Sequence, residues 1–493
     1  MFWHGIWKEN NSPRSGILAD IKNRTRHKYH YAIRFIQNNR EDISAVKMGN
    51  ALANNSDRDL WKEARKKKSS TVAKPCSVDS QIGDHNISNV FADKFKNLYN
   101  SVPYDQNEMD VLCQKIDSDI INHKCDTQCN GVIEEDYETL TTAIMMLKRS
   151  KHDGYSGLST DHLINGTVLL RKYLSKLVSV MFKSGMSPDA MKVATVIPIP
   201  KSRKKSLNNS DNYRGISLSS IIGKVADWII LIKNHDVLCT TDNQFGFKPK
   251  HSTNQCSLIV SEVVNYYKTH GSDVHCMLLD ASKAFDKVEY CRLFNILAEK
   301  QMCPMVIRFL INLYTNQSVR VNWSNYISQP FSVSNGVKQG GVLSPILFCV
   351  YIDELLVKLK DSGIGCHIGH YYFGALSYAD DIILLVPSKM ALGKVLNICS
   401  RFSLEAQIPF NPNKSEYVLF ANYCSQVEFN NTEITSSENS IHLGSVVGLN
   451  AQSMNIKNAI NEMTRNTIIL TRQFSKCNIQ VKYKLFKSYA MSL

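Results

Sequence analysis

Two adjacent carboxylates constrain the fold of this chain more than any other feature of its sequence. Asp380 and Asp381, in "SYADDIILL", stand between a short apolar segment and five consecutive apolar residues. Apolar runs of this length predict two strands, and Asp is a common turn residue. At a tight turn both carboxylates can approach one cation, whereas an isolated buried pair would repel. The doublet therefore predicts either an ordinary hairpin turn or a divalent metal site.

A third carboxylate stands at the end of another predicted strand. Asp280 closes the apolar run of "VHCMLLDASKAFDKV", about 100 residues before the doublet and six before Asp286. The carboxyl end of a strand is a common place for functional side chains. If the two strands lie side by side, three acids converge on one point. That arrangement suits two Mg²⁺ ions, which prefer oxygen ligands and keep part of their shell for substrate phosphates.

Two further segments carry features that suit a phosphate ligand. "KVATVIPIPKSRKKSLNNSDNYRGISLSS" predicts two strands around a polar loop. Cations crowd together on this hairpin, which we call the basic hairpin: Lys201, Arg203, Lys204, Lys205 and Arg214. This loop is either solvated or holds an anion. "NGVKQGGVLSPILF" predicts a glycine-rich loop followed by a helix with Ser344 as N-cap and Pro345 at the first helical position. Its glycines allow close approach of a ligand, as they would allow any tight loop.

Composition favours a folded chain with a polyanionic partner. The 493 residues are 43% hydrophobic and carry a net charge of +14, which suits several packed lobes and nucleic acid. The most basic helical pattern covers residues 17–39, "ARKKK" follows at 64–68, and the tail beyond residue 449 predicts two or three basic amphipathic helices.

The cysteines and the hydropathy exclude other classes of protein. Fourteen cysteines occur as singles without any CxxC pair, which argues against a disulfide framework and predicts reduced thiols in an intracellular protein. The nearest approach to a metal cluster is "HKCDTQC", with His123, Cys125 and Cys129, which lacks a clear second ligand pair. No run of 18 apolar residues occurs, so we expect no membrane span.

The motifs together resemble the reverse transcriptases of non-LTR (LINE-type) retrotransposons, in particular the jockey-like branch. Eight blocks between Leu147 and Gly444 follow the order of that family: "MLKRSKHDGYSGLSTDHL", "VATVIPIPK" with "DNYRGISLSSIIGKV", "QFGFKPKHST", "LLDASKAFDKV", "GVKQGGVLSPILFCVYIDEL", "YADD", "NPNKSEYVLF" and "HLG". "YADD" alone would be a weak signal, but the ordered series is specific.

The resemblance implies an α+β right-hand polymerase fold, with an antiparallel palm sheet backed by helices and a helical thumb. We expect four regions: a basic extension, partly helical or flexible, over 1–125, a fingers-rich region over 126–270, the palm with the catalytic site over 271–425, and an incomplete thumb over 426–493. The implied activity is RNA-directed DNA polymerisation, a nucleotidyl transfer that extends a primer 3′ end with deoxynucleotides. The implied cofactor is a pair of Mg²⁺ ions, or Mn²⁺ in their place.

The same resemblance assigns roles at the catalytic point. Asp280 matches the first metal-binding aspartate of the family, and Asp380 with Asp381 matches the doublet. Asp286 matches a family position without a metal role, so we interpret it as structural. Phe285 matches the aromatic residue that packs on the sugar of the incoming nucleotide, where a ring would exclude a 2′-hydroxyl; the alternative is a core phenylalanine.

The remaining roles concern the nucleotide and the primer. Lys201 and Arg214 match residues that hold the triphosphate, and Gln339 with Gly340 and Gly341 matches the loop that packs on the template base and nucleotide. Tyr378 resembles the residue beside the primer end. Lys414 resembles a lysine near the pyrophosphate, although an exposed loop lysine is a common alternative.

Three functions follow as hypotheses. The first is an RNA-directed DNA polymerase with an RNA template, a DNA primer or target DNA, and dNTPs as partners, in the cytoplasm and the nucleus. The second is an inactive, truncated nucleic-acid-binding remnant of such an element. The third is an RNA-templated RNA polymerase, because polymerases share the palm.

Overall fold

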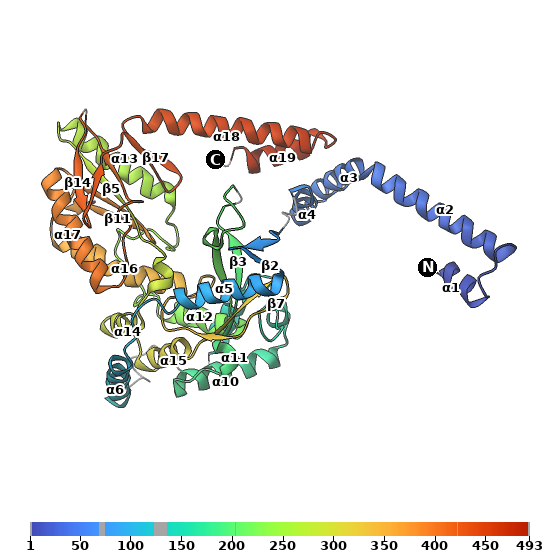
Figure 1. Cartoon of the computed structure of the whole chain (residues 1–493), viewed down its shortest axis with the longest axis horizontal. Helices are drawn as coiled ribbons and strands as arrows, with labels where there is room; N and C mark the ends of the chain where they lie inside the picture. The colour runs from blue at the N-terminus through green and yellow to red at the C-terminus, as the bar shows by residue number, and fades with distance from the viewer. Residues whose placement is uncertain (1, 69–73, 123–135, 203, 422, 492–493) are drawn as a thin grey trace. The chain divides into compact units, whose positions relative to one another are not determined.

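The computed structural model describes residues 2–68, 74–122, 136–202, 204–421 and 423–491 (Figure 1). Contacts divide the chain into a terminal unit, made of Met1–Ala73 and Gln452–Leu493, and a central unit, Lys74–Ala451. The cluster of His123, Cys125 and Cys129 lies outside the described residues, as does Arg203. The four regions expected from the sequence, over 1–125, 126–270, 271–425 and 426–493, remain predictions.

Four antiparallel strands form the central sheet, in the order β11-β12-β5-β13. Their bounds are β5 His275–Asp280, β11 Ala375–Tyr378, β12 Asp381–Val386 and β13 Glu416–Leu419. Side chains alternate between the two faces: Met277 and Leu384 join one apolar cluster, and Leu278 and Ile383 join another. Because both faces are covered, the strands are continuous apolar runs, and the polar groups lie at the strand ends.

Helices cover both faces of this sheet (Figure 1). α13 (Thr253–Thr269) contributes Val260, Val263 and Val264 to one cluster, and α16 (Ser344–Asp361) and α17 (Lys389–Glu405) line the other. The predicted α+β architecture, with an antiparallel sheet backed by helices, is confirmed. Among the described residues, the other helices of the central unit are α5 Asp84–Leu98, α6 Gln106–Asn122, α8 Tyr137–Met145, α9 Thr160–Ile164, α10 Val168–Ser184, α11 Asp189–Lys192, α12 Ile221–Lys233, α14 Tyr290–Glu299 and α15 Pro304–Thr315.

A second sheet carries the basic hairpin. Its order is β4-β3-β6-β7 with β8 on β6, and its strands are β3 Val193–Pro200, β4 Tyr213–Leu218, β6 Ser318–Trp323, β7 Tyr326–Ile327 and β8 Phe331–Ser332. α5 packs on this sheet through Phe91 and Phe95. Gly215 of β4 lies beneath α5, where a Cβ would come within 2.8 Å of Tyr99 Oη and 2.9 Å of Phe95 Cε1. The helix can therefore approach β4 closely only because this residue has no side chain.

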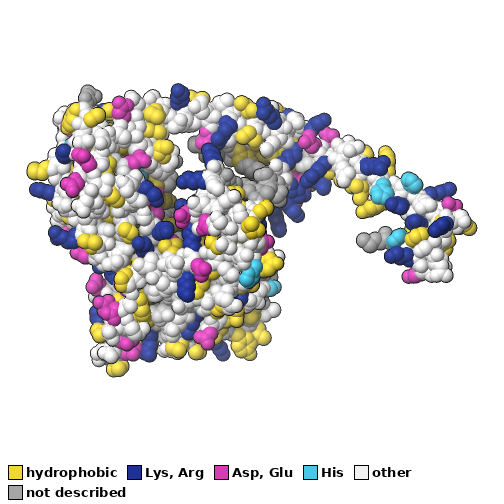
Figure 2. Space-filling model, viewed as in Figure 1, with side chains coloured by type: hydrophobic (Ala, Val, Ile, Leu, Met, Phe, Trp, Pro, Cys, Tyr) yellow, Lys and Arg dark blue, Asp and Glu magenta, His cyan; other side chains and the backbone are white. Residues whose placement is uncertain are grey.

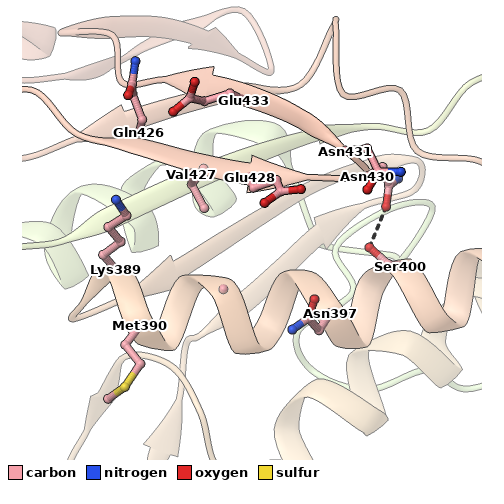
Figure 3. A pocket seen from close by; sticks show the side chains of 11 residues that line it. Lys389, Met390, Asn397, Ser400, Gln426, Val427, Glu428, Asn430, Asn431 and Glu433 are labelled. Carbon is pink, nitrogen blue, oxygen red and sulfur yellow. Dashed lines mark hydrogen bonds between the residues drawn. The ribbon is translucent and has the colours of Figure 1, made fainter.

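The described residues of the central unit also form four short hairpins: β1 Ser77–Val78 with β2 Gln81–Ile82, β9 His367–Ile368 with β10 Tyr371–Tyr372, β14 Gln426–Phe429 with β15 Thr432–Thr435, and β16 Asn439–His442 with β17 Ser445–Gly448. Between α17 and β14–β15 runs a polar groove with Lys389 at one end and Asn430 at the other (Figure 3). Ser400 Oγ donates to Asn430 Oδ1 at 2.7 Å and closes that second end.

The terminal unit joins both ends of the chain around one small core. Met48 and Leu60 from the first part of the chain pack with Phe474, Val481 and Leu485 from the last part. Its helices are α1 Phe2–Glu9, α2 Ile17–Asn38, α3 Arg40–Ala53, α4 Asp57–Lys68, α18 Ala451–Gln473 and α19 Ile479–Tyr489. The basic helix predicted over 17–39 and the predicted helices of the tail are thus confirmed, and Figure 2 shows Lys and Arg side chains over this unit.

Within the described ranges, the structure contains no helix that is both long enough and apolar enough to cross a bilayer.

Candidate active site

The doublet lies where β11 turns back into β12. Tyr378 is the register partner of Asp381, so Ala379 and Asp380 form a two-residue turn. The predicted hairpin is confirmed. Ala379 has a φ of 59°, in the left-handed region that residues with a side chain rarely adopt. The turn that carries the doublet is therefore held in a conformation that its own sequence does not favour.

Asp280 ends the neighbouring strand and lies directly beside the doublet. It is the register partner of Asp381 in the β12–β5 pair, so the two predicted strands do lie side by side. Burial raises the pKa of Asp381 to about 6, and the charges of Asp380 and Asp280 raise it too. Burial also raises the pKa of Asp380, where the Arg214 charge acts in the opposite direction. The three carboxylates thus repel one another at one end of the sheet.

Lys414 reaches this acidic point from the turn before β13. Its Nζ lies 3.8 Å from Asp280 Oδ2, and its side chain is 63% exposed. The turn is fixed to β5, because the Asn411 amide donates to the Asp280 carbonyl at 2.9 Å and the Asp280 amide donates to Ser415 Oγ at 3.2 Å. The structure thus brings Lys414 to the site, with most of its ammonium free to contact a ligand.

A group of cations gathers around the basic hairpin. Lys201 Nζ donates to the Asp211 carbonyl at 2.9 Å. Burial lowers the pKa of Lys201, and the nearby charges of Lys94, Arg214 and Lys283 lower it further. Lys94 and Lys283 were missed from the sequence. Lys283 could have been predicted to lie near the site, because it follows Asp280 by three residues. Lys94 could not, because it belongs to α5, which is distant in the sequence.

Phe285 belongs to a stack of aromatic rings near the end of β5. Its ring stacks on Phe348 of α16 at a centroid distance of 4.2 Å and meets the exposed Phe247 edge-on at 6.4 Å. Phe285 lies in the short 3-10 turn Ala284–Lys287 and is half-buried. One part of the ring is therefore fixed by packing, and the other part is accessible.

Asp286 binds the glycine-rich loop. Gln339 Nε2 donates to Oδ1 and Oδ2 of Asp286 at 2.8 and 2.9 Å. The Gln339 carbonyl accepts the Ser217 amide of β4 at 2.7 Å. Burial raises the pKa of Asp286 to about 6, and the bond from Gln339 acts against that rise. Gln339 thus connects the turn after β5 with the basic hairpin.

The two glycines beside Gln339 make this close packing feasible. Gly340 has a φ of +108°, and a Cβ there would lie 3.1 Å from the Ser217 carbonyl. A Cβ on Gly341 would lie 2.4 Å from Ser344 Oγ. The loop therefore lies close to β4 at Gly340 and close to the start of α16 at Gly341, and a side chain at either position would have to displace its neighbours.

The start of α16 differs from the sequence prediction. Ser344 is the first helical residue and Leu343 is the N-cap, so the prediction of Ser344 as the N-cap is wrong. Asp227 of α12 supplies the missing acceptor, because its Oδ2 accepts the Leu343 amide at 3.4 Å. Burial raises the pKa of Asp227 to about 6 and lowers that of Lys338 to about 8, and the charge of each group opposes the shift of the other. Asp227 is a positioning group that the sequence did not indicate.

A divalent cation fits the chemistry of the three acids. In the described part of the chain, no group of three or more His, Cys, Asp or Glu side chains is positioned to hold a metal ion as it stands. Asp280, Asp380 and Asp381 nevertheless offer only oxygen donors, which Mg²⁺ prefers. A bound cation would also offset the repulsion that raises the pKa of the doublet.

Comparison with known proteins places this chain in a family of sequences. The family model described as "Reverse transcriptase (RNA-dependent DNA polymerase)" matches residues 199–456, more than half of the chain. The Pol polyprotein from type-2 retrotransposable element R2DM of Drosophila melanogaster is 24% identical over 294 residues, which are 60% of this chain and 27% of that protein. The RNA-directed DNA polymerase from mobile element jockey of Drosophila funebris is 25% identical over 326 residues, 63% of this chain and 35% of that protein.

The match therefore spans about a third or less of these relatives. A solved structure of apo telomerase from Candida Tropicalis, truncated from its C-terminal domain, aligns with a TM-score of 0.39 at 14% identity and covers 61% of this chain and 62% of that one. We draw no conclusion from a likeness of that extent.

Proposed function

Because the chain belongs to the reverse transcriptase (RNA-dependent DNA polymerase) family, we propose that it is the polymerase of a non-LTR retrotransposon and extends a primer 3′ end with dNTPs on an RNA template. We assign the central sheet to the palm of the right-hand polymerase fold, because all four of its strands lie within the residues that match the family model. The observation that carries the proposal is the register of Asp381 against Asp280, with Asp380 in the adjoining turn.

Reverse transcriptases normally use a divalent metal, and we propose two Mg²⁺ ions held by Asp280, Asp380 and Asp381, with Mn²⁺ as a substitute. Bound metal would activate the primer 3′-hydroxyl and stabilise the leaving pyrophosphate. The residues of the chain supply the rest of the chemistry. Phosphoryl transfer depends on positioning and on neutralisation of charge. Lys201 and Arg214 would hold the triphosphate, and Lys414, 3.8 Å from Asp280, would donate a proton to the pyrophosphate.

Four residues would select the nucleotide and contact the primer. The accessible part of Phe285 would pack on the deoxyribose and exclude a 2′-hydroxyl. Gln339, held by Asp286, would support the nascent base pair together with Gly340. Tyr378, opposite Asp381 in the hairpin, would contact the primer end.

The proposed partners are an RNA template, a DNA primer or target DNA, and dNTPs. The net charge of +14 supports a polyanionic ligand, and binding should weaken steeply as salt rises. We propose that the protein works inside the cell, in the cytoplasm and the nucleus.

Primer extension by the purified chain tests the proposal. The assay uses a primed RNA template, dNTPs and Mg²⁺, with Asp380→Asn as the active-site variant and Asp236→Asn, at an exposed position, as the matched control. We expect extension by the wild type and the control but none by Asp380→Asn. Salt-sensitive binding of the primed template without extension by any protein would favour the inactive remnant. Equal use of ribonucleotides would favour the RNA polymerase.

A further inference from the structure

A buried glutamine binds the turn that carries the doublet. Gln244 lies between α12 and α13 and is fully inaccessible to solvent. Its Oε1 accepts the Ala379 amide at 2.9 Å and the Gly246 amide at 2.8 Å. Its Nε2 donates to Ser377 Oγ at 3.2 Å, and that hydroxyl donates to the Ala379 carbonyl at 2.7 Å. One side chain thus satisfies the amide of Ala379 directly and its carbonyl through Ser377.

The backbone around Gln244 is fitted to the same hairpin. Gln244 and Ser377 form a parallel bridge, in which the Phe245 amide donates to the Ser377 carbonyl at 2.7 Å and the Ser377 amide donates to the Asn243 carbonyl at 2.9 Å. A Cβ on Gly246 would lie only 2.4 Å from the Ala379 nitrogen. The segment therefore lies directly against the turn and leaves no room for the turn to shift toward it.

The turn needs such a support because of the residue at its first central position. A two-residue hairpin with positive φ at that position favours glycine, whereas this chain has Ala379 at a φ of 59°. The left-handed conformation is unfavourable for alanine, so the hydrogen bonds to the amide and carbonyl of Ala379 must stabilise it. Asp380 follows Ala379 directly, and a change in the turn would displace the carboxylates of the doublet.

We propose that Gln244 is a positioning residue that fixes the catalytic turn through Ala379. It acts on Asp380 and Asp381 through the backbone and does not itself contact the substrate. The proposal rests on the proposed polymerase function for its kinetic consequence, while its structural consequence can be measured without activity.

The test compares three variants. Gln244→Met keeps the length of the side chain and removes the three hydrogen bonds that its amide group makes, to the Ala379 amide, the Gly246 amide and Ser377 Oγ. Gln244→Glu keeps an acceptor for both amides. Gln317→Met is the matched control, because Gln317 is also a buried glutamine, 5% exposed, whose Nε2 has no hydrogen-bond partner. Each protein is assayed for single-nucleotide extension, and hydrogen exchange is followed over residues 375–385.

Gln244→Met should lower kcat by about 100-fold with the KM for dNTP changed by less than about threefold. It should also accelerate exchange in the hairpin while exchange in α13 and α16 stays as in the wild type. Gln244→Glu should recover part of both losses, and Gln317→Met should show neither. A Gln244→Met protein with wild-type kcat and wild-type exchange would overturn the proposal.

Two other outcomes are also decisive. If the wild type itself does not extend a primer, the polymerase proposal fails and the exchange rates alone decide the role of Gln244. If Gln244→Met does not fold, Ser377→Ala replaces it. This change removes the hydroxyl that accepts from Gln244 Nε2 and donates to the Ala379 carbonyl, and it leaves the bond from the Ala379 amide to Gln244 Oε1 in place. Local acceleration of exchange in that variant supports the proposal, and unchanged exchange refutes it.

Discussion

Replacing Asp381 by asparagine should stabilise the metal-free protein while it abolishes polymerisation. The pKa of Asp381 rises from 3.8 to about 6 on folding. A raised pKa means that the folded state prefers the protonated acid, so the ionised carboxylate destabilises the fold at neutral pH. Two pKa units correspond to a ceiling of about 3 kcal/mol. Neighbouring groups crowd the carboxylate of Asp381, but water still reaches the residue, so screening reduces this ceiling to about 1 kcal/mol.

The pH dependence gives the sign of the effect. The destabilisation is absent below about pH 4, where Asp381 is protonated in both states, and it is complete above about pH 6. In EDTA at pH 7.5, Asp381→Asn should therefore raise the melting temperature by about 1–2 °C, and at pH 4 the difference should vanish. Mg²⁺ should raise the melting temperature of the wild type and leave that of the variant unchanged.

Thermal unfolding with and without EDTA measures these differences, and Asp236→Asn, at an exposed position, is the control for the change of charge. A variant that melts at or below the wild-type temperature in EDTA at pH 7.5 would refute the reasoning. So would a stabilisation of equal size at pH 4, because the effect would then not come from an ionised carboxylate.

Three further predictions follow from the surroundings of the site. Asp286→Ala removes both hydrogen bonds from Gln339. Because hydrogen bonds to a charged group contribute about 1.5–3 kcal/mol, kcat/KM for dNTP should fall by roughly 10- to 100-fold. Asp286→Asn keeps one acceptor and should lose less, and equal losses in the two variants would contradict this role. Phe285→Ala should raise the use of ribonucleotides relative to deoxynucleotides in single-nucleotide extension. Phe348→Leu, which changes the buried side chain beneath the Phe285 ring, should leave this ratio as in the wild type. An unchanged ratio in Phe285→Ala would show that the ring is only a core residue. Gly215→Ala should destabilise the central unit by about 1–3 kcal/mol, because its Cβ would lie 2.8 Å from Tyr99 Oη. Urea unfolding measures this loss, with Gly223→Ala as the control, since the nearest atoms to a Cβ there lie at 3.7 Å. Equal stability of the two variants would refute the prediction.

The sequence predicted the elements and the acidic point because their signals are local. Apolar runs that end in Asp280 and begin after Asp381 identify β5 and β12 as strands, and acids at the ends of such runs can meet only if the strands pair. The family resemblance then supplied the order of the fold. The sequence did not predict the contacts through which Gln244 and Asp286 position the site. Gln244 meets Ala379 across 135 positions of the chain, and Asp286 meets Gln339 across 53. Neither contact leaves a periodicity or a spacing that can be recognised from one sequence.

The discontinuous terminal unit imposes an order on the biosynthesis of the protein. Its core needs Met48 and Leu60 from the first part of the chain and Phe474 and Val481 from the last part, so α3 and α4 leave the ribosome without the partners that cover their apolar faces. At ordinary rates of translation, about 5–20 residues per second, the nascent helices wait for roughly 20–80 s while the whole central unit is synthesised. The central unit can fold during this interval, and its folding shortens the loop that must close before the two chain ends meet. The basic terminal unit can therefore assemble only after the residues of the active site have been synthesised.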